Sequence, residues 1–211
     1  MVNYLLMICA DLENLTNLEP HDGCDDLNFS YLFKSFMVKC GCCGELSQKE
    51  TCVSLGDTVP NSSGKGTTNL IQKVISLSLS LCKCKFCGRD GTVTMIKGRG
   101  KPLTQEASQS GKYCPVMLFD CRGFEPVDFI FGDGWKVESY AVLVIQEHYQ
   151  YMCAIVCYLD ANRKILGNHG NIAGTKYEGI DLSNGDFAEY DEKGECPVMI
   201  SNLRSKFDVV K

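Results

Sequence analysis

The chain has 211 residues, of which 45% are hydrophobic and 22% are charged, and its formal net charge is −5. This length suits one large domain or two small ones, and the apolar fraction is sufficient for a sizeable core. The acidic balance argues against a protein that coats nucleic acid through its overall field. The most apolar stretch, 141–159, carries Glu147 and His148, whereas a spanning helix needs about 20 predominantly apolar residues. We therefore expect no membrane span.

The chain contains 14 cysteines. They would form disulfides in a secreted protein, but would be metal ligands or buried thiols in a reducing compartment. The first residues carry no basic segment, and the short apolar run meets Asp11 and Glu13 at once, which is unlike a signal peptide. We expect a reduced protein of the cytoplasm or the nucleus, with most cysteines outside paired motifs serving as small core residues.

Short apolar runs separated by Gly, Asn, Asp and Pro predict a mainly β protein. In chain order, the predicted strands cover 4–12, 31–39, 51–55, 92–97, 116–121, 127–131, 179–182 and 198–209, the last with an interruption. The stretch 141–160 fits either a helix or a strand.

A weak internal duplication suggests two related units. Asn17-Leu-Glu-Pro20 resembles Gly123-Phe-Glu-Pro126, and Cys-Pro-Val-Met occurs at both 114–117 and 196–199. The polar stretch 102–113 has the composition of a linker. We therefore predict two tandem, similar β-sandwich or barrel-like units, residues 1–105 and 106–211.

The main chemical signal is a pair of C-x-x-C motifs, each followed directly by Gly. They are Cys40-Gly-Cys-Cys43 and Cys84-Lys-Phe-Cys87. Two thiolates three positions apart converge on one ion when the chain turns tightly between them, and the following Gly supplies a positive φ. Two such turns provide the tetrahedral sulfur site that structural zinc prefers. We predict one Zn²⁺ per chain, bound by these four cysteines within the first unit.

Other interpretations of the four thiols remain open. They could be buried thiols, two local redox pairs, or ligands of an iron–sulfur cluster. Cys42 and Cys82 lie beside the motifs and are possible substitute ligands. Cys40 and Cys42 have one residue between them, which forms a poorer turn, so Cys43 is preferred.

No catalytic pattern accompanies these motifs. Catalytic zinc usually has His or carboxylate ligands and an open position, but His21, His148 and His169 lie away from both motifs. The sequence has no Walker A, G-x-S-x-G or H-E-x-x-H motif. We expect no enzymatic activity. A basic cluster surrounds the second motif and could contact nucleic acid, although a solvated charged face is the preferred interpretation; its members are Lys83, Lys85, Arg89, Lys97, Arg99 and Lys101.

Together with the two motifs, further segments resemble the eukaryotic CXXC motif-containing zinc-binding proteins, also known as domain of unknown function 866. They are Leu12–Leu18, Lys39–Gly41, Cys43–Glu45, Gln72–Lys73, Cys84–Cys87, Cys121–Phe129 and Tyr190–Lys193. The resemblance runs from end to end. It implies a β-rich protein of two similar tandem units with zinc held by the four matched cysteines, and no established catalytic activity.

The chain is longer than members of that family, which have about 160 residues. Residues 74–83 interrupt a junction that the family keeps continuous, 140–173 separate Ser139 from Gly174, and 35–37 form a smaller extra piece. We interpret these segments as insertions that come from retained introns or an error in the gene sequence. Transcript sequencing that found all three in the mature message would contradict this.

These observations predict a non-catalytic, monomeric protein with a structural zinc site of four cysteines, which acts through contacts with a protein partner. The alternatives are a metal-handling protein that passes zinc or copper to a client, and a nucleic-acid-binding zinc ribbon.

Overall fold

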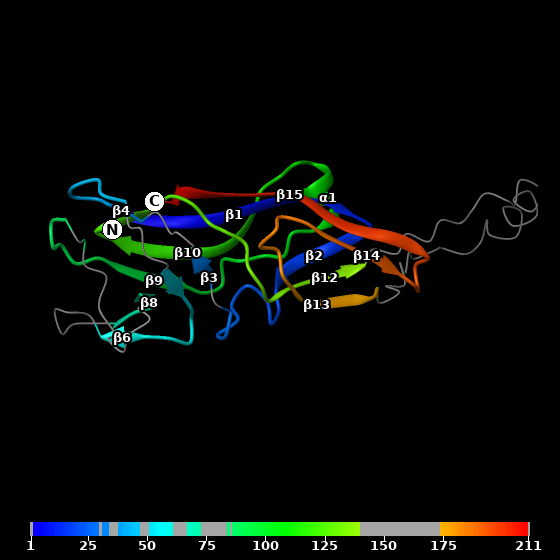
Figure 1. Ribbon diagram of the computed structural model, residues 1–211, viewed down its shortest axis with the longest axis horizontal. Helices are drawn as coiled ribbons and strands as arrows, with labels where there is room; N and C mark the ends of the chain where they lie inside the picture. Colours follow the sequence, from blue (N-terminus) through cyan, green and yellow to red (C-terminus); the bar gives the residue numbers. More distant parts are fainter. Residues whose placement is uncertain are drawn as a thin grey trace, which may run out of the picture.

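The protein is an elongated, mainly β molecule, seen here in a computed structural model (Figure 1). The structure describes residues 2–29, 31–33, 38–46, 51–60, 67–72, 84, 86–139 and 174–210. The elements are β1 (Val2–Glu13), β2 (Leu15–Pro20), β3 (Tyr31–Phe33), β4 (Val38–Cys40), β5 (Thr51–Val53), β6 (Val59–Pro60), β7 (Thr67–Thr68), β8 (Leu70–Gln72), β9 (Thr92–Ile96), α1 (Gln105–Gln109), β10 (Cys114–Arg122), β11 (Phe124–Pro126), β12 (Trp135–Ser139), β13 (Lys176–Ile180), β14 (Phe187–Asp191) and β15 (Cys196–Val210). The predicted mainly β class is confirmed.

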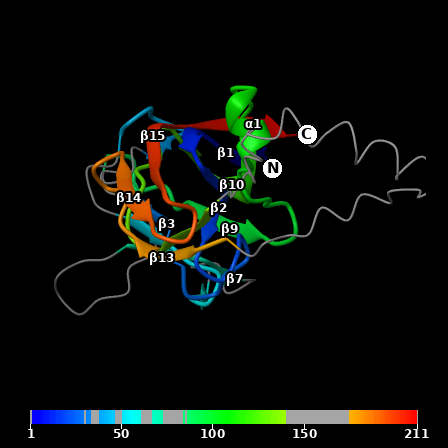
Figure 2. The same ribbon diagram turned by 90° about the vertical axis from the view of Figure 1, so that its right-hand side faces the viewer.

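A five-stranded antiparallel sheet in the order β14-β15-β1-β10-β9 forms the long axis of the molecule. Smaller sheets lie toward the two ends. β3-β5-β8, β6-β7 and β4-β11 lie toward one end, and β2-β12-β13 lies toward the other (Figure 1). Figure 2 looks along this axis and shows these strands curling around a common interior.

The strands exchange partners between the two halves of the chain. β9 pairs with β10, and β1 pairs with β15. In addition, β2 of the first half pairs with β12 of the second, whereas β11 of the second pairs with β4 of the first. The five-stranded sheet therefore contains strands from both 1–105 and 106–211. The division of the chain into two tandem units at this boundary stays a prediction.

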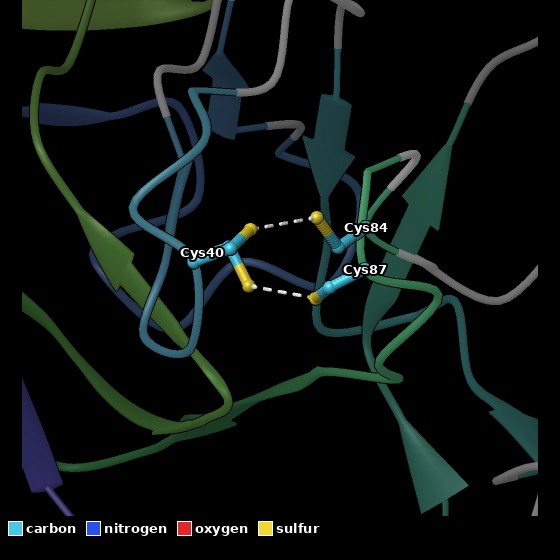
Figure 3. A group of neighbouring side chains, drawn as sticks. Cys40, Cys84 and Cys87 are labelled. Carbon is cyan, nitrogen blue, oxygen red and sulfur yellow. Dashed lines mark hydrogen bonds between the residues drawn. The ribbon is translucent and has the colours of Figure 1, made fainter.

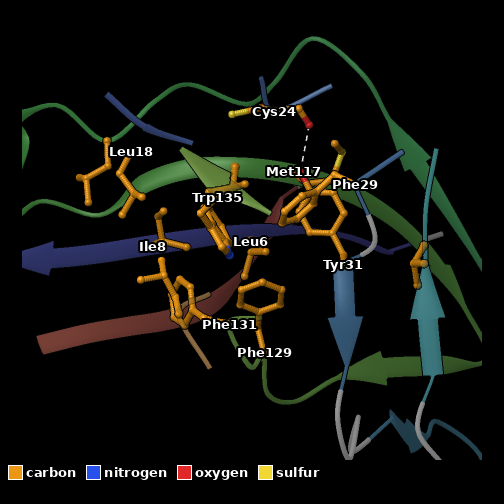
Figure 4. Packing of buried hydrophobic residues seen from close by; sticks show 14 of the residues in the cluster. Leu6, Ile8, Leu18, Cys24, Phe29, Tyr31, Met117, Phe129, Phe131 and Trp135 are labelled. Atoms are coloured by element: carbon orange, nitrogen blue, oxygen red, sulfur yellow. Dashed lines mark hydrogen bonds between the residues drawn. The ribbon is translucent and has the colours of Figure 1, made fainter. Parts of the chain in front are cut away.

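The core is built from side chains of both halves. β1 contributes Leu6 and Ile8, which are fully buried. Aromatic side chains pack beside these two residues and contact one another edge to face. The ring centroids of Phe29 and Trp135, for example, are 5.2 Å apart (Figure 4). The Tyr31 hydroxyl donates a 2.9 Å hydrogen bond to the Cys24 carbonyl oxygen, so this buried polar group is satisfied.

Several predicted strands are confirmed, and other predictions are wrong. Residues 127–131 form no strand, because the chain between β11 and β12 is irregular. Phe129 and Phe131 are nonetheless buried, which explains the apolar pattern. The stretch 102–113 is not a free linker. It contains α1, Leu103 is buried, and the Ser108 hydroxyl accepts a 2.9 Å hydrogen bond from the backbone N–H of Leu12.

The three predicted insertions, 35–37, 74–83 and 140–173, lie outside the described residues, and so does the ambiguous stretch 141–160. Among the residues that the structure describes, no helix has both the length and the apolar character needed to cross a membrane.

Candidate metal centre

The two C-x-x-C motifs form turns that face each other (Figure 3). The Sγ atoms of Cys40 and Cys87 are 3.7 Å apart, and those of Cys43 and Cys84 are 3.4 Å apart. All four sulfur atoms lie within 4.8 Å of one another. Zinc–sulfur bonds of about 2.3 Å in a tetrahedron place sulfur atoms about 3.8 Å apart. The four thiols therefore form a group that could hold a metal ion.

The first turn follows directly from strand β4, which ends at Cys40. The backbone N–H of Gly44 donates a 2.9 Å hydrogen bond to the carbonyl oxygen of Cys40, and the Cys40 N–H donates one of 2.8 Å to the carbonyl oxygen of Glu45. Gly44 has a φ of 76°, a conformation that a side chain disfavours. These bonds bring Cys43 back toward Cys40.

The second turn repeats this pattern. The N–H of Gly88 donates a 2.8 Å hydrogen bond to the carbonyl oxygen of Cys84, and the Cys84 N–H donates one of 2.9 Å to the carbonyl oxygen of Arg89. Gly88 has a φ of 69°. The predicted requirement for a positive φ after each second cysteine is thus confirmed in both turns.

Backbone amides in each turn favour ionisation of its first thiol. The pKa of Cys40 is lowered to about 6 by hydrogen bonds from the backbone N–H groups of Cys43 and Cys42. The pKa of Cys84 is also lowered, mainly by the backbone N–H of Cys87. A thiolate is the form of cysteine that binds a metal, so each turn offers one group that ionises readily.

The second thiols behave in the opposite way. The backbone N–H of Glu45 lowers the pKa of Cys43. Burial and the Cys84 thiol together raise this pKa by more than that, so the net shift is upward. For Cys87, the N–H of Arg89 is likewise outweighed by burial and the neighbouring thiols, and its pKa is raised to about 12. Four thiolates cannot gather without a cation, because like charges at this distance repel.

A third segment supports both turns, and the sequence did not assign it to the site. β11 pairs with β4, and the N–H of Gly41 donates a 3.0 Å hydrogen bond to the carbonyl oxygen of Gly123. A Cβ on Gly123 would lie 2.9 Å from the carbonyl oxygen of Asp90, and one on Gly91 would overlap the ring of Phe124. The run Cys121–Phe129 thus packs behind both turns. The distinctive sequence of this run was the one signal that could have assigned it to the site.

The substitute ligands are not part of the group. Cys42 is exposed and lies outside the four-sulfur cluster, and Cys82 lies outside the described residues. Cys9, Cys24 and Cys121 are buried among core side chains, as expected. His21 lies at the surface beside Asp22, whereas His148 and His169 are not among the described residues.

The basic cluster is described only in part. Lys97, Arg99 and Lys101 are exposed, as is Arg89 in the second turn. Lys83 and Lys85 lie outside the described residues. Exposed charges are expected both of a solvated face and of a nucleic-acid contact, so the preference for a solvated face stays a prediction.

Known proteins resemble this chain in sequence over most of its length. The sequence model of a eukaryotic family, "CXXC motif containing zinc binding protein", matches residues 5–147 and 167–208. The unmatched residues 148–166 fall inside the predicted insertion at 140–173. A protein of that name from Xenopus laevis is 29% identical over 207 residues, covering 98% of each chain. Its human counterpart is 29% identical over 202 residues, covering 96% of this chain and 95% of the human protein.

Two solved structures share the fold. The crystal structure of C1orf123 is 26% identical, has a TM-score of 0.69 and covers 99% of each chain. A hypothetical protein from Plasmodium falciparum, at 17% identity and a TM-score of 0.66, covers 99% of this chain and all of its own, and shows the fold alone. With a family match over most of its length and all four motif cysteines gathered at one point, the chain belongs to the eukaryotic CXXC motif-containing zinc-binding proteins.

Proposed function

We propose that the chain binds one Zn²⁺ through Cys40, Cys43, Cys84 and Cys87, and that this ion is structural. The observation that carries the proposal is the meeting of two turns with matching hydrogen bonds at four sulfur atoms within 4.8 Å. Zinc takes four thiolates in closed structural sites, whereas catalytic sites keep a position open. Four cysteine ligands leave no such position, which supports a non-catalytic role.

The ion would join two segments that are far apart in the sequence. Cys40 is the last residue of β4, whereas Cys84 lies much later in the sequence. Both turns contact the segment around Gly123. Structural zinc sites contribute roughly 10–16 kcal/mol of apparent binding free energy, which is comparable to the whole stability of a domain. Metal binding would therefore decide whether this end of the molecule keeps its fold.

The test is metal content by elemental analysis beside thermal unfolding. Cys43→Ser and Cys87→Ser are the informative variants, and Cys42→Ser is the matched control, because Cys42 lies in the same turn but outside the sulfur cluster. We expect about one zinc per wild-type chain and per Cys42→Ser chain, with loss of zinc and a lower Tm in the other two. Zinc retained in Cys43→Ser and lost in Cys42→Ser would contradict the assignment of ligands.

We also propose that the protein acts as a monomer through contacts with a protein partner, at the end that carries the metal centre. Phe86 projects from the second turn with 80% of its surface exposed, and Leu46 and Val127 are exposed beside the first turn and β11. Exposed aromatic side chains on rigid turns are typical anchors of interfaces. The four-thiolate site requires reduced cysteines, which supports the cytoplasm as the compartment.

Phe86→Ser tests the contact role, with Tyr190→Ser as control, because Tyr190 is 56% exposed on β14 at the opposite end. Both variants should keep their zinc and their Tm. Crosslinking followed by mass spectrometry should lose partner proteins in Phe86→Ser only. Equal crosslinking in the two variants would place the contact elsewhere.

One observation favours metal handling as a second candidate function. Cys43 and Cys87 are exposed, and so is the additional thiol of Cys42, so an acceptor could reach the ion. Zinc transfer to a chromogenic chelator within seconds would support handling, whereas transfer over hours would support a structural ion. Slower transfer from Cys42→Ser than from wild type would identify Cys42 as the entering ligand.

A further inference from the structure

Each half of the chain pairs one of its strands with a strand of the other half: β4 pairs with β11, and β12 pairs with β2. These two pairings allow positions near the metal centre to be compared with positions at the opposite end. In the first half, Cys40 at the end of β4 pairs with Phe124 on β11. In the second half, Ser139 at the end of β12 pairs with Leu15 on β2. Phe124 and Leu15 are each the first residue of their strand, and each follows a residue with a positive φ. Ser139 therefore occupies the position that corresponds to Cys40.

One of the two hydrogen bonds that close the first turn is repeated there. The N–H of Cys40 donates a 2.8 Å bond to the carbonyl oxygen of Glu45, and the N–H of Ser139 donates a 2.8 Å bond to the carbonyl oxygen of Thr175. In each half, the N–H at the end of a strand thus donates to the carbonyl oxygen of a residue further along the chain. Thr175 thus corresponds to Glu45.

The second turn has a counterpart between β14 and β15. Cys84 donates its N–H to Arg89, five residues later, and Asp191 pairs with Cys196, also five residues later. Asp191 accordingly corresponds to Cys84.

The backbone within these turns agrees with the match. Gly88 has a φ of 69°, and Glu195, at the corresponding position, has a φ of 47°, which is rare for a residue with a side chain. Gly194 then corresponds to Cys87. A Cβ built on Gly194 would lie 2.9 Å from the Asp191 carboxylate, so position 194 faces residue 191 as Cys87 faces Cys84.

The side chains at these matched positions are joined to one another by direct hydrogen bonds. The Asp191 carboxylate is only 2% exposed, and its Oδ1 accepts a 2.6 Å hydrogen bond from the Thr175 hydroxyl and a 3.1 Å bond from the N–H of Lys193. The Thr175 N–H donates a 2.8 Å bond to the Ser139 hydroxyl oxygen. Ser139 is itself buried. A buried carboxylate is stable when it receives hydrogen bonds of this kind.

We propose that Ser139, Thr175 and Asp191, here called the Asp191 cluster, are the metal-free counterpart of the metal centre. Hydrogen bonds to the Asp191 carboxylate connect the end of β12 with the β14–β15 turn. In the proposed function, on which this inference rests, an ion shared by four thiolates connects the two C-x-x-C turns in the same way. The two ends of the molecule then differ in one respect. Loss of metal opens the C-x-x-C end and leaves the Asp191 end closed, so the chain responds to metal at one end only.

Hydrogen exchange of the full chain, with and without a chelator, tests this response. The amides of Cys40, Gly44 and Gly88 should exchange at least about tenfold faster after metal removal, whereas those of Ser139 and Thr175 should keep their rates. Asp191→Ala in the zinc-loaded protein should give the reverse pattern. Faster exchange at both ends after chelation would overturn the inference. No effect of zinc on the first end would instead contradict the proposed function.

A cobalt titration tests the match of positions independently of the natural site. The triple variant Ser139→Cys/Asp191→Cys/Gly194→Cys should bind one more Co²⁺ than wild type, seen as additional thiolate-to-cobalt absorption, because its three thiols would face one another. Equal cobalt binding by wild type and by a triple variant that still unfolds cooperatively would overturn the match. If the triple variant does not fold, the hydrogen-exchange comparison decides the inference.

Discussion

The backbone N–H of Gly41 donates a 3.0 Å hydrogen bond to the carbonyl oxygen of Gly123, which joins the first C-x-x-C turn to the strand-to-strand corner behind it. Gly123 has a φ of 77°, and a Cβ at this position would lie 2.9 Å from the carbonyl oxygen of Asp90, next to the second turn. One glycine therefore touches both turns, and the geometry of the sulfur cluster depends on it.

Gly123→Ala should destabilise the protein by about 2–4 kcal/mol, from the strained φ and the clash with Asp90 together, and should weaken zinc binding. Gly111→Ala is the control, because Gly111 also has a positive φ, 61°, but has open space around its Cβ position. It should cost only about 1 kcal/mol and keep the zinc. Urea denaturation and metal content measure both effects. Equal losses in the two variants would mean that the clash contributes nothing.

Ser108→Ala should destabilise the protein by about 1–3 kcal/mol, because it leaves the buried backbone N–H of Leu12 without its acceptor. Ser110→Ala is the matched control at the end of the same helix, where the hydroxyl donates to the carbonyl oxygen of Glu106 at an exposed position. This control should change stability by less than about 0.5 kcal/mol. If the two variants unfold at the same urea concentration, the contact between α1 and β1 is not a stabilising one.

Asp191 should give the stability a dependence on acid pH. Hydrogen bonds from Ser139 and Thr175 lower the pKa of Asp191 in the folded state, so the unfolded chain binds its proton more tightly. The resulting stabilisation is fully present above the unfolded pKa of about 3.9 and is lost as the pH falls through the folded value. The free energy of unfolding of Asp191→Asn, measured from pH 6 downward, should fall less steeply than that of wild type. Parallel curves would show that Asp191 is not the titrating group.

Replacing residues 141–172 by a two-residue turn should preserve the fold. The N–H of Ser139 and the carbonyl oxygen of Thr175 close the base of this segment with a 2.8 Å hydrogen bond, and the family match omits 148–166. A roughly sevenfold shorter segment lowers the closure cost by about 1.7 kcal/mol, so Tm should rise. A shortened chain that fails to fold would show that the segment belongs to the structural core.

The sequence pointed to the group of four cysteines because its determinants are local. The spacing of Cys40 and Cys43, repeated at Cys84 and Cys87, and the glycine after each pair specify a turn without reference to the rest of the chain. The strands β1 and β10 were also predicted, since their apolar runs are distinctive. The strand at 198–209 was predicted with an interruption, because its middle is polar, and this part was wrong: β15 is continuous from Cys196 to Val210.

Features that depend on contacts between distant segments were not predicted. The buried Phe129 and Phe131 suggested a strand, although their apolar character serves the aromatic core instead. The hydrogen bonds among Ser139, Thr175 and Asp191 connect strands whose pairing no local pattern reveals. The role of Gly123 likewise depends on two turns that reach it from other parts of the chain.

The pairing of β1 with β15 has a consequence for synthesis of the protein. β1 leaves the ribosome well before β15, while β10, the other neighbour of β1, emerges between them. The apolar residues of β1 therefore have no partner strand when they are first made, and the sheet can close only after β15 has been synthesised. Such non-local pairing folds slowly and leaves nascent strands open to aggregation, so β1 stays exposed to such contacts until β15 has been made.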